Sequence, residues 1–456
     1  MGGGYLTIIG LGPGDPRART IGAQQVIDAA STIILRTAIH PGLDDLLGDS
    51  RVVTCDDLYE RAEAFDDLYR AIAARVCAAS QSATVGEVVY AVPGHPRFGE
   101  RSVGDVIERA AVAGIAVRVL DAVSAVDSVA TLLGIDPMAE DLQMLDGAAL
   151  AAVANEEPFS GGRVVFSPLR PVLVSQVYSR AVASGVKLAL SRLLPDNHPV
   201  KIVRAASVSS AATVVDAALY ELDHWNVDHL TSIWAPALGT LEAGRDPRTL
   251  QHVVARLRAP GGCPWDRQQT HATLRDAVID EAHEVVDAID ADDAENLAEE
   301  LGDLFLLVAM HAQLAEERGT FTLEDVFEGI ARKIVRRHPH VFGNHAAEDA
   351  AAVVRTWNQV KAEEKASRST PARAKAADGQ PHSMPALTRA RRVLKLHPYI
   401  EGVEAPADAG EVLLAAVARV IDAGGDPDTI LRAALTRHVA RHEEISTNQP
   451  DSARVR

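Results

Sequence analysis

The chain has 456 residues and a formal net charge of −18, with 63 acidic against 45 basic side chains. This length is too great for one typical domain and predicts two or three. The negative charge opposes broad attraction to nucleic acid or to an anionic membrane, so we expect neither as a partner. No apolar run approaches the ~18 residues of a membrane span, no signal-peptide pattern opens the chain, and the three cysteines suggest neither disulfides nor zinc. We therefore expect a cytoplasmic protein.

The first half of the chain alternates short β-prone runs with helical patterns, which predicts an α/β fold. Strands are expected at 5–9, 32–36, 51–55, 87–92 and 115–121, and helices at about 19–30, 58–77 and 102–113. Two of the strands end in Gly/Pro turns, at 10–16 and 92–96, and Ser124, Asp127 and Ser128 open a further helix. In open α/β sheets such loops bind ligands. The first turn is a ligand loop or a tight strand-to-helix turn, and Asp15 in place of a third glycine disfavours NAD.

Several segments together resemble the S-adenosylmethionine-dependent tetrapyrrole (corrin/porphyrin) methylases. They are GLGPGDP at 10–16, YAVPGHP at 90–96, AVSAVDSVATLLGIDP at 122–137, and the longer stretches 173–206 and 218–238. The resemblance implies a two-subdomain α/β domain over 1–238 with S-adenosylmethionine in the cleft. It implies cofactor contacts by Gly10, Gly12, Pro13, Gly14, Asp15, Pro93, Gly94, His95, Ser124 and Ser128. Active members commonly carry Asp where this chain has His95, so either methyl transfer or a non-catalytic, cofactor-sensing role stays open.

Residues 239–250 are expected to be a linker, and from 251 the pattern is helical. Within it stand two pairs of carboxylates at i, i+3 spacing, Glu281 with Glu284 and Glu300 with Asp303. Each pair shares a helix face, and a turn near 290–293 would bring both faces together. Four facing carboxylates suit a hard divalent cation, Mg²⁺ or Mn²⁺. A solvated acidic face is the alternative, but the apolar run 304–310 predicts a buried helix, where acidic groups need a partner.

Two further segments closely resemble the MazG family of nucleoside triphosphate pyrophosphohydrolases. They are CPWDRQQTHATLRDAVIDEAHEVVDAI from Cys263 and EELGDLFLLVAMHA from Glu299, and one departure is Asp280, where the family often has Glu. The resemblance implies an all-α catalytic domain over 251–365 that converts nucleoside triphosphates to monophosphates and pyrophosphate, and usually a homodimer. With the methylase-like half, the chain resembles the fused proteins of the YabN type.

The same resemblance assigns the four carboxylates to the metal and places Lys333, Arg337 and Trp357 at nucleotide-contacting positions. Lys361 is a further candidate, although a solvated helix face is the alternative for it and for Lys365. Arg275 stands at the pocket entrance or in a packing role. The general base is Glu299 or a ligand carboxylate acting through a metal-bound water, and both remain open.

Residues 366–383 predict a second linker, and 384–456 can be compared with the catalytic domain. Segment 410–418 can be laid on 302–310, and 426–441 on 322–337, so that Glu411 matches Asp303. We interpret the tail as a degenerate second MazG-like repeat that lost its metal helices, the alternative being a coincidental alanine-rich helix pair. The whole chain is thus expected to be multidomain, with an α/β tetrapyrrole-methylase-like N-terminal half and an all-α MazG-type helical bundle as its C-terminal half.

Overall fold

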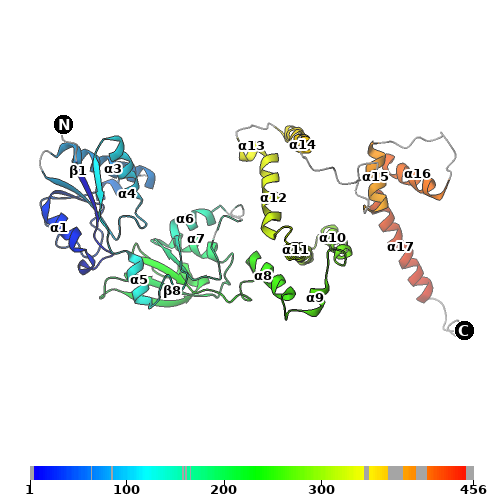
Figure 1. The fold of residues 1–456 in the computed structure, drawn as a ribbon, viewed down its shortest axis with the longest axis horizontal. Coiled ribbons are helices and arrows are strands. Elements are labelled where there is room, and N and C mark those ends of the chain that lie inside the picture. Colours follow the sequence, from blue (N-terminus) through cyan, green and yellow to red (C-terminus); the bar gives the residue numbers. More distant parts are fainter. Residues whose placement is uncertain are drawn as a thin grey trace. The chain divides into compact units, whose positions relative to one another are not determined.

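The computed structural model describes residues 5–62, 64–83, 86–156, 159, 162–164, 166–343, 349–367, 384–396 and 408–447. The chain forms two compact units, Met1–Val326 and Phe327–Arg456. Figure 1 shows the α/β elements of the first half and the helices that follow them. The expected fold class, α/β followed by all-α, is confirmed.

The chain begins with a five-stranded parallel sheet in the order β3-β2-β4-β1-β5. Its strands are β1 Tyr5–Gly10, β2 Ala30–Leu35, β3 Val52–Thr54, β4 Glu87–Val92 and β5 Ala116–Val119. The helices of this subdomain are η1 Pro16–Ala18, α1 Ile21–Ala29, α2 Asp56–Tyr59, α3 Phe65–Ser82 and α4 Arg101–Val112. The central strands β1 and β4 are almost entirely buried, as expected for a parallel sheet covered on both faces. α1 packs on one face, and α3 and α4 pack on the other.

The single helix expected over 58–77 is wrong, because the structure has two helices there, α2 and α3. The chain becomes extended at Ala64, the residue that precedes α3. Asp66 and Asp67 then lie in the first turn of α3. Carboxylates favour a helix start because their negative charge interacts favourably with the positive end of the helix dipole. The helical spacing of apolar residues in the sequence therefore runs through the break between the two helices.

The second subdomain contains a mixed sheet in the order β6-β7-β10-β8-β9. Its strands are β6 Gln143–Asp146, β7 Val172–Ser175, β8 Pro199–Arg204, β9 Thr213–Ala218 and β10 Thr231–Ala235. Its helices are α5 Ala125–Leu133, α6 Gly147–Ala154, α7 Arg180–Leu190 and η2 Leu219–His224. Among the described residues of this sheet, β6 and β7 pair in parallel, and the other pairings are antiparallel. α6 and α7 contribute to the large apolar core of the subdomain.

The segment after β10 is packed against this subdomain. Ala243 is fully buried, and Arg245 Nη1 donates to the carbonyl oxygens of Ser191 at 2.6 Å and Leu194 at 3.1 Å. Asp246 caps α8 (Pro247–Arg258), so this helix begins within the stretch expected to be a linker. An N-cap aspartate followed by proline at the first helical position favours a helix start here.

The rest of Met1–Val326 is helical. It contains α9 Pro264–Gln268, α10 Arg275–Asp290 and α11 Ala294–Glu316, and α12 Leu323–Arg337 begins near its end. The second unit contains α13 Pro339–Phe342, α14 Ala350–Ser367, α15 Ala386–Leu396, α16 Ala409–Asp422 and α17 Pro427–Thr447. Most of the expected second linker, 368–383, lies outside the described residues. Within the described part of the chain, no helix combines the length and apolar character needed to cross a bilayer.

Candidate active site

The predicted carboxylate site lies on the α10–α11 hairpin. Glu281, Glu284 and Glu300 each contribute one carboxylate oxygen to a group of three that lie within 4.8 Å of one another. The turn between the helices is formed by residues 291–293, in the region where the sequence predicted it. Asp292 adopts a left-handed conformation with φ of 54°. Asp293 then caps α11 by accepting from the backbone N–H groups of two following residues at 3.1 Å. The i, i+3 spacings and a local turn therefore suffice to bring the three carboxylates together.

The electrostatics of this cluster fit a bound cation. Glu300 is only 9% exposed. Burial and the negative charge of Glu284 raise the pKa of the Glu300 carboxyl. Burial, Glu284 and Asp303 likewise raise the pKa of Glu281. A hard divalent cation would counter this crowding of negative charge, and carboxylate oxygens are the ligands that Mg²⁺ and Mn²⁺ prefer.

Two other acidic residues of the predicted site are exposed. Asp303 lies near enough to raise the pKa of Glu281 and Glu300, but it does not belong to the group of three within 4.8 Å. Glu299 is also exposed, one residue before the buried Glu300. Asp303 as a fourth ligand and Glu299 as a base therefore remain predictions.

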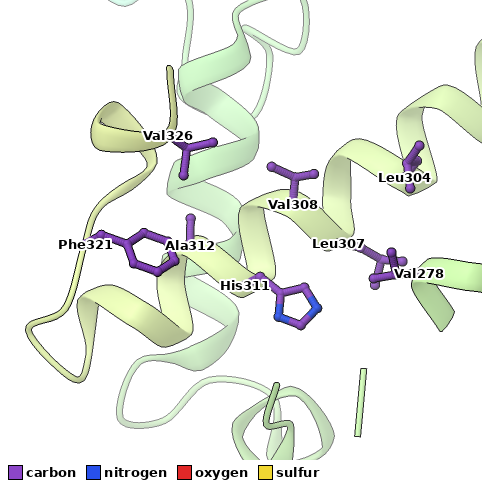
Figure 2. A pocket seen from close by; sticks show the side chains of 8 residues that line it. All are labelled: Val278, Leu304, Leu307, Val308, His311, Ala312, Phe321 and Val326. Carbon is purple, nitrogen blue, oxygen red and sulfur yellow. The ribbon is translucent and has the colours of Figure 1, made fainter. Parts of the chain in front are cut away.

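An apolar pocket of about 210 Å³ adjoins this hairpin. Figure 2 shows its lining, which comes from α10, α11, the loop between α11 and α12, and the first turn of α12: Val278, Leu304, Leu307, Val308, His311, Ala312, Phe321 and Val326. The helix was expected to be buried on nearly every side, but Val308 is 37% exposed. The residues of α11 in this lining recur at positions i, i+3, i+4, i+7 and i+8, so one face of the helix borders the pocket. Helical spacing in the sequence could have identified this face.

A histidine pair lies at the pocket. The Nδ1 atoms of His271 and His311 are 2.8 Å apart, and their rings stack with centroids separated by 5.1 Å. One imidazole must donate and the other accept. Burial and the neighbouring His271 lower the pKa of His311. Arg275, predicted near the pocket entrance, pairs with the adjacent Asp276 at 2.9 Å and is exposed.

The predicted cation and indole meet in the second unit. Arg337, at the end of α12, bonds Glu364 of α14 with Nη2 to Oε2 at 2.5 Å. Its guanidinium carbon lies 5.0 Å from the Trp357 ring centroid. Lys333 is half-buried one helical turn earlier, and Lys361 is exposed. The structure thus groups the predicted residues into a carboxylate cluster in Met1–Val326 and a cation–indole cluster in Phe327–Arg456.

The glycine-rich loops of the first subdomain contact each other through their backbones. Gly12 N–H donates to the Gly94 carbonyl at 3.3 Å, and Gly94 N–H donates to the Gly12 carbonyl at 2.8 Å. β1 and β4 are parallel neighbours, so their carboxyl ends bring both loops to one edge of the sheet. Both glycines have positive φ, 76° and 65°. Any side chain at these positions would strain the backbone.

Neighbouring groups fix the first loop. His40 Nε2 lies 3.1 Å from the Gly12 carbonyl oxygen, and Ser207 Oγ donates to the Pro13 carbonyl at 2.6 Å. The Asp15 carboxylate pairs with Arg17 at 2.7 Å, and this contact lowers its pKa. Asp15 therefore has a structural role at the start of η1, in addition to the predicted cofactor contact.

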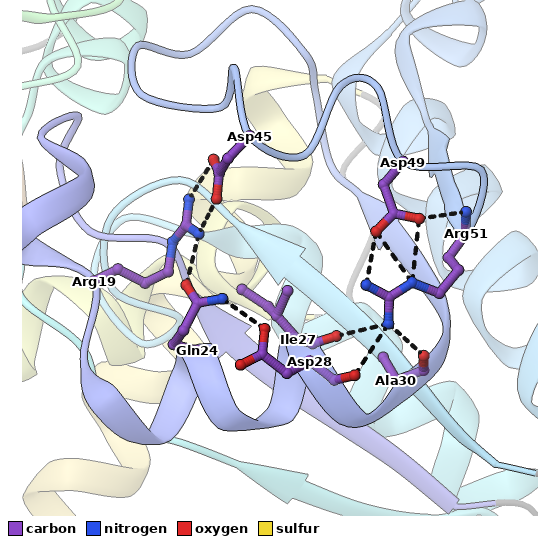
Figure 3. A network of polar contacts seen from close by, with 8 residues as sticks. All are labelled: Arg19, Gln24, Ile27, Asp28, Ala30, Asp45, Asp49 and Arg51. Atoms are coloured by element: carbon purple, nitrogen blue, oxygen red, sulfur yellow. Dashed lines mark hydrogen bonds and ion pairs between the residues drawn. The ribbon is translucent and has the colours of Figure 1, made fainter.

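The helix after the first loop is held by two arginines (Figure 3). Arg19 pairs with Asp45 and bonds Gln24, near the start of α1. At the other end of α1, Arg51 Nη1 donates to the carbonyl oxygens of residues 27, 28 and 30, and the guanidinium is also paired with Asp49. A cation at this end favours the helix, because the last carbonyls lack intrahelical partners.

The other predicted cofactor contacts are divided between capping and a shallow pocket. Ser124 forms a capping box with Asp127 at the start of α5. Ser128 lines a pocket of about 250 Å³ with Val123, Asp127, Thr131, Leu132 and Ala206. His95 Nδ1 accepts from the Arg97 backbone N–H at 3.0 Å. Gly10 is the last residue of β1, and Gly14 and Pro93 lie in the two loops that follow β1 and β4.

Comparison with known proteins agrees with this arrangement. Residues 5–223 match the family model of the tetrapyrrole (corrin/porphyrin) methylases, and residues 269–342 match that of the MazG nucleotide pyrophosphohydrolase domain. The chain therefore joins a methylase-type α/β domain to a MazG-type domain. It is 36% identical over 397 residues to the uncharacterized protein YabN of Bacillus subtilis, covering 86% of this chain and 77% of that protein. The chain belongs to the YabN family, which confirms both resemblances.

Two other similar proteins each match one part of this chain. The nucleoside triphosphate pyrophosphohydrolase of Escherichia coli K12 is 44% identical over 144 residues, 31% of this chain and 54% of that protein, so this chain spans about half of that relative. The uroporphyrin-III C-methyltransferase of Thermus thermophilus, solved with S-adenosyl homocysteine, is 18% identical with a TM-score of 0.38, covering 51% of this chain and 97% of that one.

Proposed function

We propose that the MazG domain hydrolyses nucleoside triphosphates to nucleoside monophosphates and pyrophosphate in a Mg²⁺-dependent reaction, with Mn²⁺ as a possible substitute. The observation that carries the proposal is the group of three carboxylates within 4.8 Å on the α10–α11 hairpin. The E. coli relative, matched over this part of the chain, is named a nucleoside triphosphate pyrophosphohydrolase.

Separate residues are proposed to hold the cation and to orient the attacking water. Glu281, Glu284 and Glu300, joined by Asp303, would hold the cation. When bound, it supplies positive charge to the phosphate oxygens and acidifies a coordinated water. Glu299 is a candidate to orient the attacking water and accept its proton. The oxygen of that water attacks the α-phosphorus, the bond to the bridging α–β oxygen breaks, and pyrophosphate leaves.

Positive charge is also needed where pyrophosphate departs. Lys333 and Arg337 follow each other by one turn on α12 and are proposed to contact the phosphates. Trp357 is proposed to stack on the base, with Lys361 and Arg275 at the edge of the site. Such a reaction would remove aberrant or surplus nucleotides in the cytoplasm, and we propose a homodimer as the working form.

The test is product analysis of a nucleotide panel with the full chain and Mg²⁺. We expect monophosphate and pyrophosphate. Release of orthophosphate and a diphosphate would contradict the proposal.

The metal assignment has its own variant. Glu300→Gln should lower the rate by on the order of a hundredfold, because a cation loses a charged ligand. The matched control is Glu316→Gln, an exposed carboxylate on the same helix. Full activity in Glu300→Gln would overturn the metal assignment.

We further propose that the methylase-type domain binds S-adenosylmethionine. The paired loops at Gly12 and Gly94 favour this, since they present bare backbone at the carboxyl edge of a parallel sheet. Calorimetry with S-adenosylmethionine tests binding. Binding without methyl transfer would support a cofactor-sensing role over a methyltransferase.

A further inference from the structure

Glu364 of α14 is a carboxylate that the motif does not contain, and it is almost completely buried. Its side chain is 8% exposed, and it pairs with two consecutive arginines at the end of α12, Arg336 and Arg337. Arg337 contributes two contacts, Nη2 to Oε2 at 2.5 Å and Nε to Oε1 at 3.3 Å. Arg337 is itself largely buried, whereas Arg336 is mostly exposed. Glu364 therefore holds Arg337 side-on in a fixed orientation.

The same guanidinium lies against the indole of Trp357. The guanidinium carbon is 5.0 Å from the ring centroid, within the range of a cation–π contact. His338 meets this indole edge-on, with ring centroids 5.0 Å apart. Arg337 thus lies over one face of the indole.

The side-on contact leaves part of the arginine for a ligand. A guanidinium has five N–H groups, and the contacts to Glu364 use those on Nε and Nη2. The N–H groups on Nη1 can then bind a phosphate oxygen while the other edge stays anchored. The carboxylate remains ionised throughout the neutral range, because Arg337 and Arg336 lower the pKa of Glu364 to about 2.

We propose that Glu364 is a positioning residue of the nucleotide site, which holds Arg337 against Trp357 so that the guanidinium meets the triphosphate and the indole meets the base. This inference rests on the proposed pyrophosphohydrolase function. It assigns no chemical step to Glu364. Its effect is to order the Arg337 and Trp357 side chains before the nucleotide arrives, which lowers the entropy lost on binding.

The neighbouring Glu363 provides a matched control. It is an exposed carboxylate on the same helix and accepts from Gln359 Nε2 at 3.1 Å, a contact within one helical turn. Glu363→Gln and Glu364→Gln remove the same charge one position apart. Only the second releases Arg337.

The first measurement is steady-state kinetics of the full chain with Mg²⁺ and a nucleoside triphosphate. We expect Glu364→Gln to raise KM about tenfold, the loss of roughly one charge-assisted hydrogen bond, and to lower kcat by a smaller factor, because Arg337 is also proposed to contact the departing pyrophosphate. Glu363→Gln should match the wild type. Glu364→Asp keeps the charge on a shorter side chain and should give an intermediate KM, which keeps the test usable if Glu364→Gln folds poorly. An unchanged or lower KM in Glu364→Gln, or an equal rise in both glutamine variants, would overturn the inference.

A second measurement does not depend on activity. Each glutamine variant is compared with the same variant carrying Trp357→Phe, and the difference spectrum gives the fluorescence of Trp357. We expect Glu364→Gln to change this spectrum, because the guanidinium leaves the indole, and Glu363→Gln to leave it unchanged. If the wild type released no pyrophosphate, the proposed function would fail. Identical difference spectra for the two glutamine variants would reject the positioning role of Glu364, whatever the activity.

Discussion

In the first glycine-rich loop, one carbonyl oxygen joins three segments of the chain. The Gly12 oxygen accepts from the Gly94 N–H and from His40 Nε2. His40 can serve as this donor in its neutral form, with the proton on Nε2. Burial lowers the pKa of His40 to about 4, and the nearby His229 and Arg36 act in the same direction.

A pH dependence follows from this shift. The unfolded chain protonates His40 near pH 6.5 and the folded chain only near pH 4, so the unfolded state binds more protons between these values. Stability contributed by His40 should be complete above about pH 6.5 and fall as the pH drops towards 4, by up to about 3 kcal/mol. Urea unfolding of wild type and His40→Gln at several pH values measures it. The glutamine can still donate to Gly12 but does not titrate, so an unchanged difference between the two proteins from pH 7 to 4 would contradict the expectation.

Among contacts between single residues, the sequence predicted best those that depend on local spacing. Glu281, Glu284 and Glu300 come together because two helical repeats and a short turn place them. The bond between Arg337 and Glu364 joins residues 27 positions apart, and no periodicity relates them. Trp265 is a large aromatic residue, yet it is 66% exposed. Residue type alone does not report burial.

Helix packing in the second subdomain depends on one glycine. A Cβ atom at Gly185 of α7 would lie 2.5 Å from the Ala151 Cβ and 2.6 Å from the Ala151 Cα of α6. Real side chains do not approach so closely, so the helices could accept a methyl group only by moving apart.

Two alanine substitutions should therefore have opposite effects. Gly185→Ala should destabilise the domain by about 1–3 kcal/mol through overpacking. Gly104→Ala, in α4, meets nothing within 4 Å and should stabilise by about 0.5–1 kcal/mol, because alanine loses less backbone entropy in a helix. Thermal unfolding of both variants checks this. Equal shifts of the unfolding temperature in the same direction would show that the close approach of α6 and α7 does not decide the stability.

Element types were predictable and element ends were less so. α10 and α11 follow their hydrophobic period, and α16 and α17 are helical where the tail was compared with the catalytic domain. The detailed match of Glu411 to Asp303 remains a prediction. The break between α2 and α3 and the early start of α8 were missed, because the spacing of apolar residues does not mark helix ends, although an aspartate followed by proline marks the start of α8.

At the scale of the whole molecule, the segment 239–246 bears on where the first domain ends. The boundary predicted from composition lies after Leu238. Beyond it, Ala243 is fully buried and Arg245 bonds two carbonyl oxygens near the end of α7. The packed structure therefore continues to Asp246.

A chain ending at Asp246 should be more stable than one ending at Leu238. We expect a difference of roughly 1–3 kcal/mol, from two hydrogen bonds of a charged donor and the burial of one small apolar side chain. Denaturant unfolding of the two shortened chains measures it. Arg245→Ala in the longer chain should remove most of the difference, and equal midpoints would place the boundary at 238.

The carboxylate cluster also has a thermodynamic consequence for the helical hairpin that carries it. Three like charges within 4.8 Å oppose the folded arrangement until a cation binds. If the proposed site is correct, each tenfold rise in free Mg²⁺ above its dissociation constant adds about 1.4 kcal/mol to the stability of this hairpin. The two glycine-rich loops of the methylase-type domain contact each other through backbone hydrogen bonds, which require no bound cation. The stability of the hairpin would then follow the free Mg²⁺ concentration, whereas this contact between the loops would not.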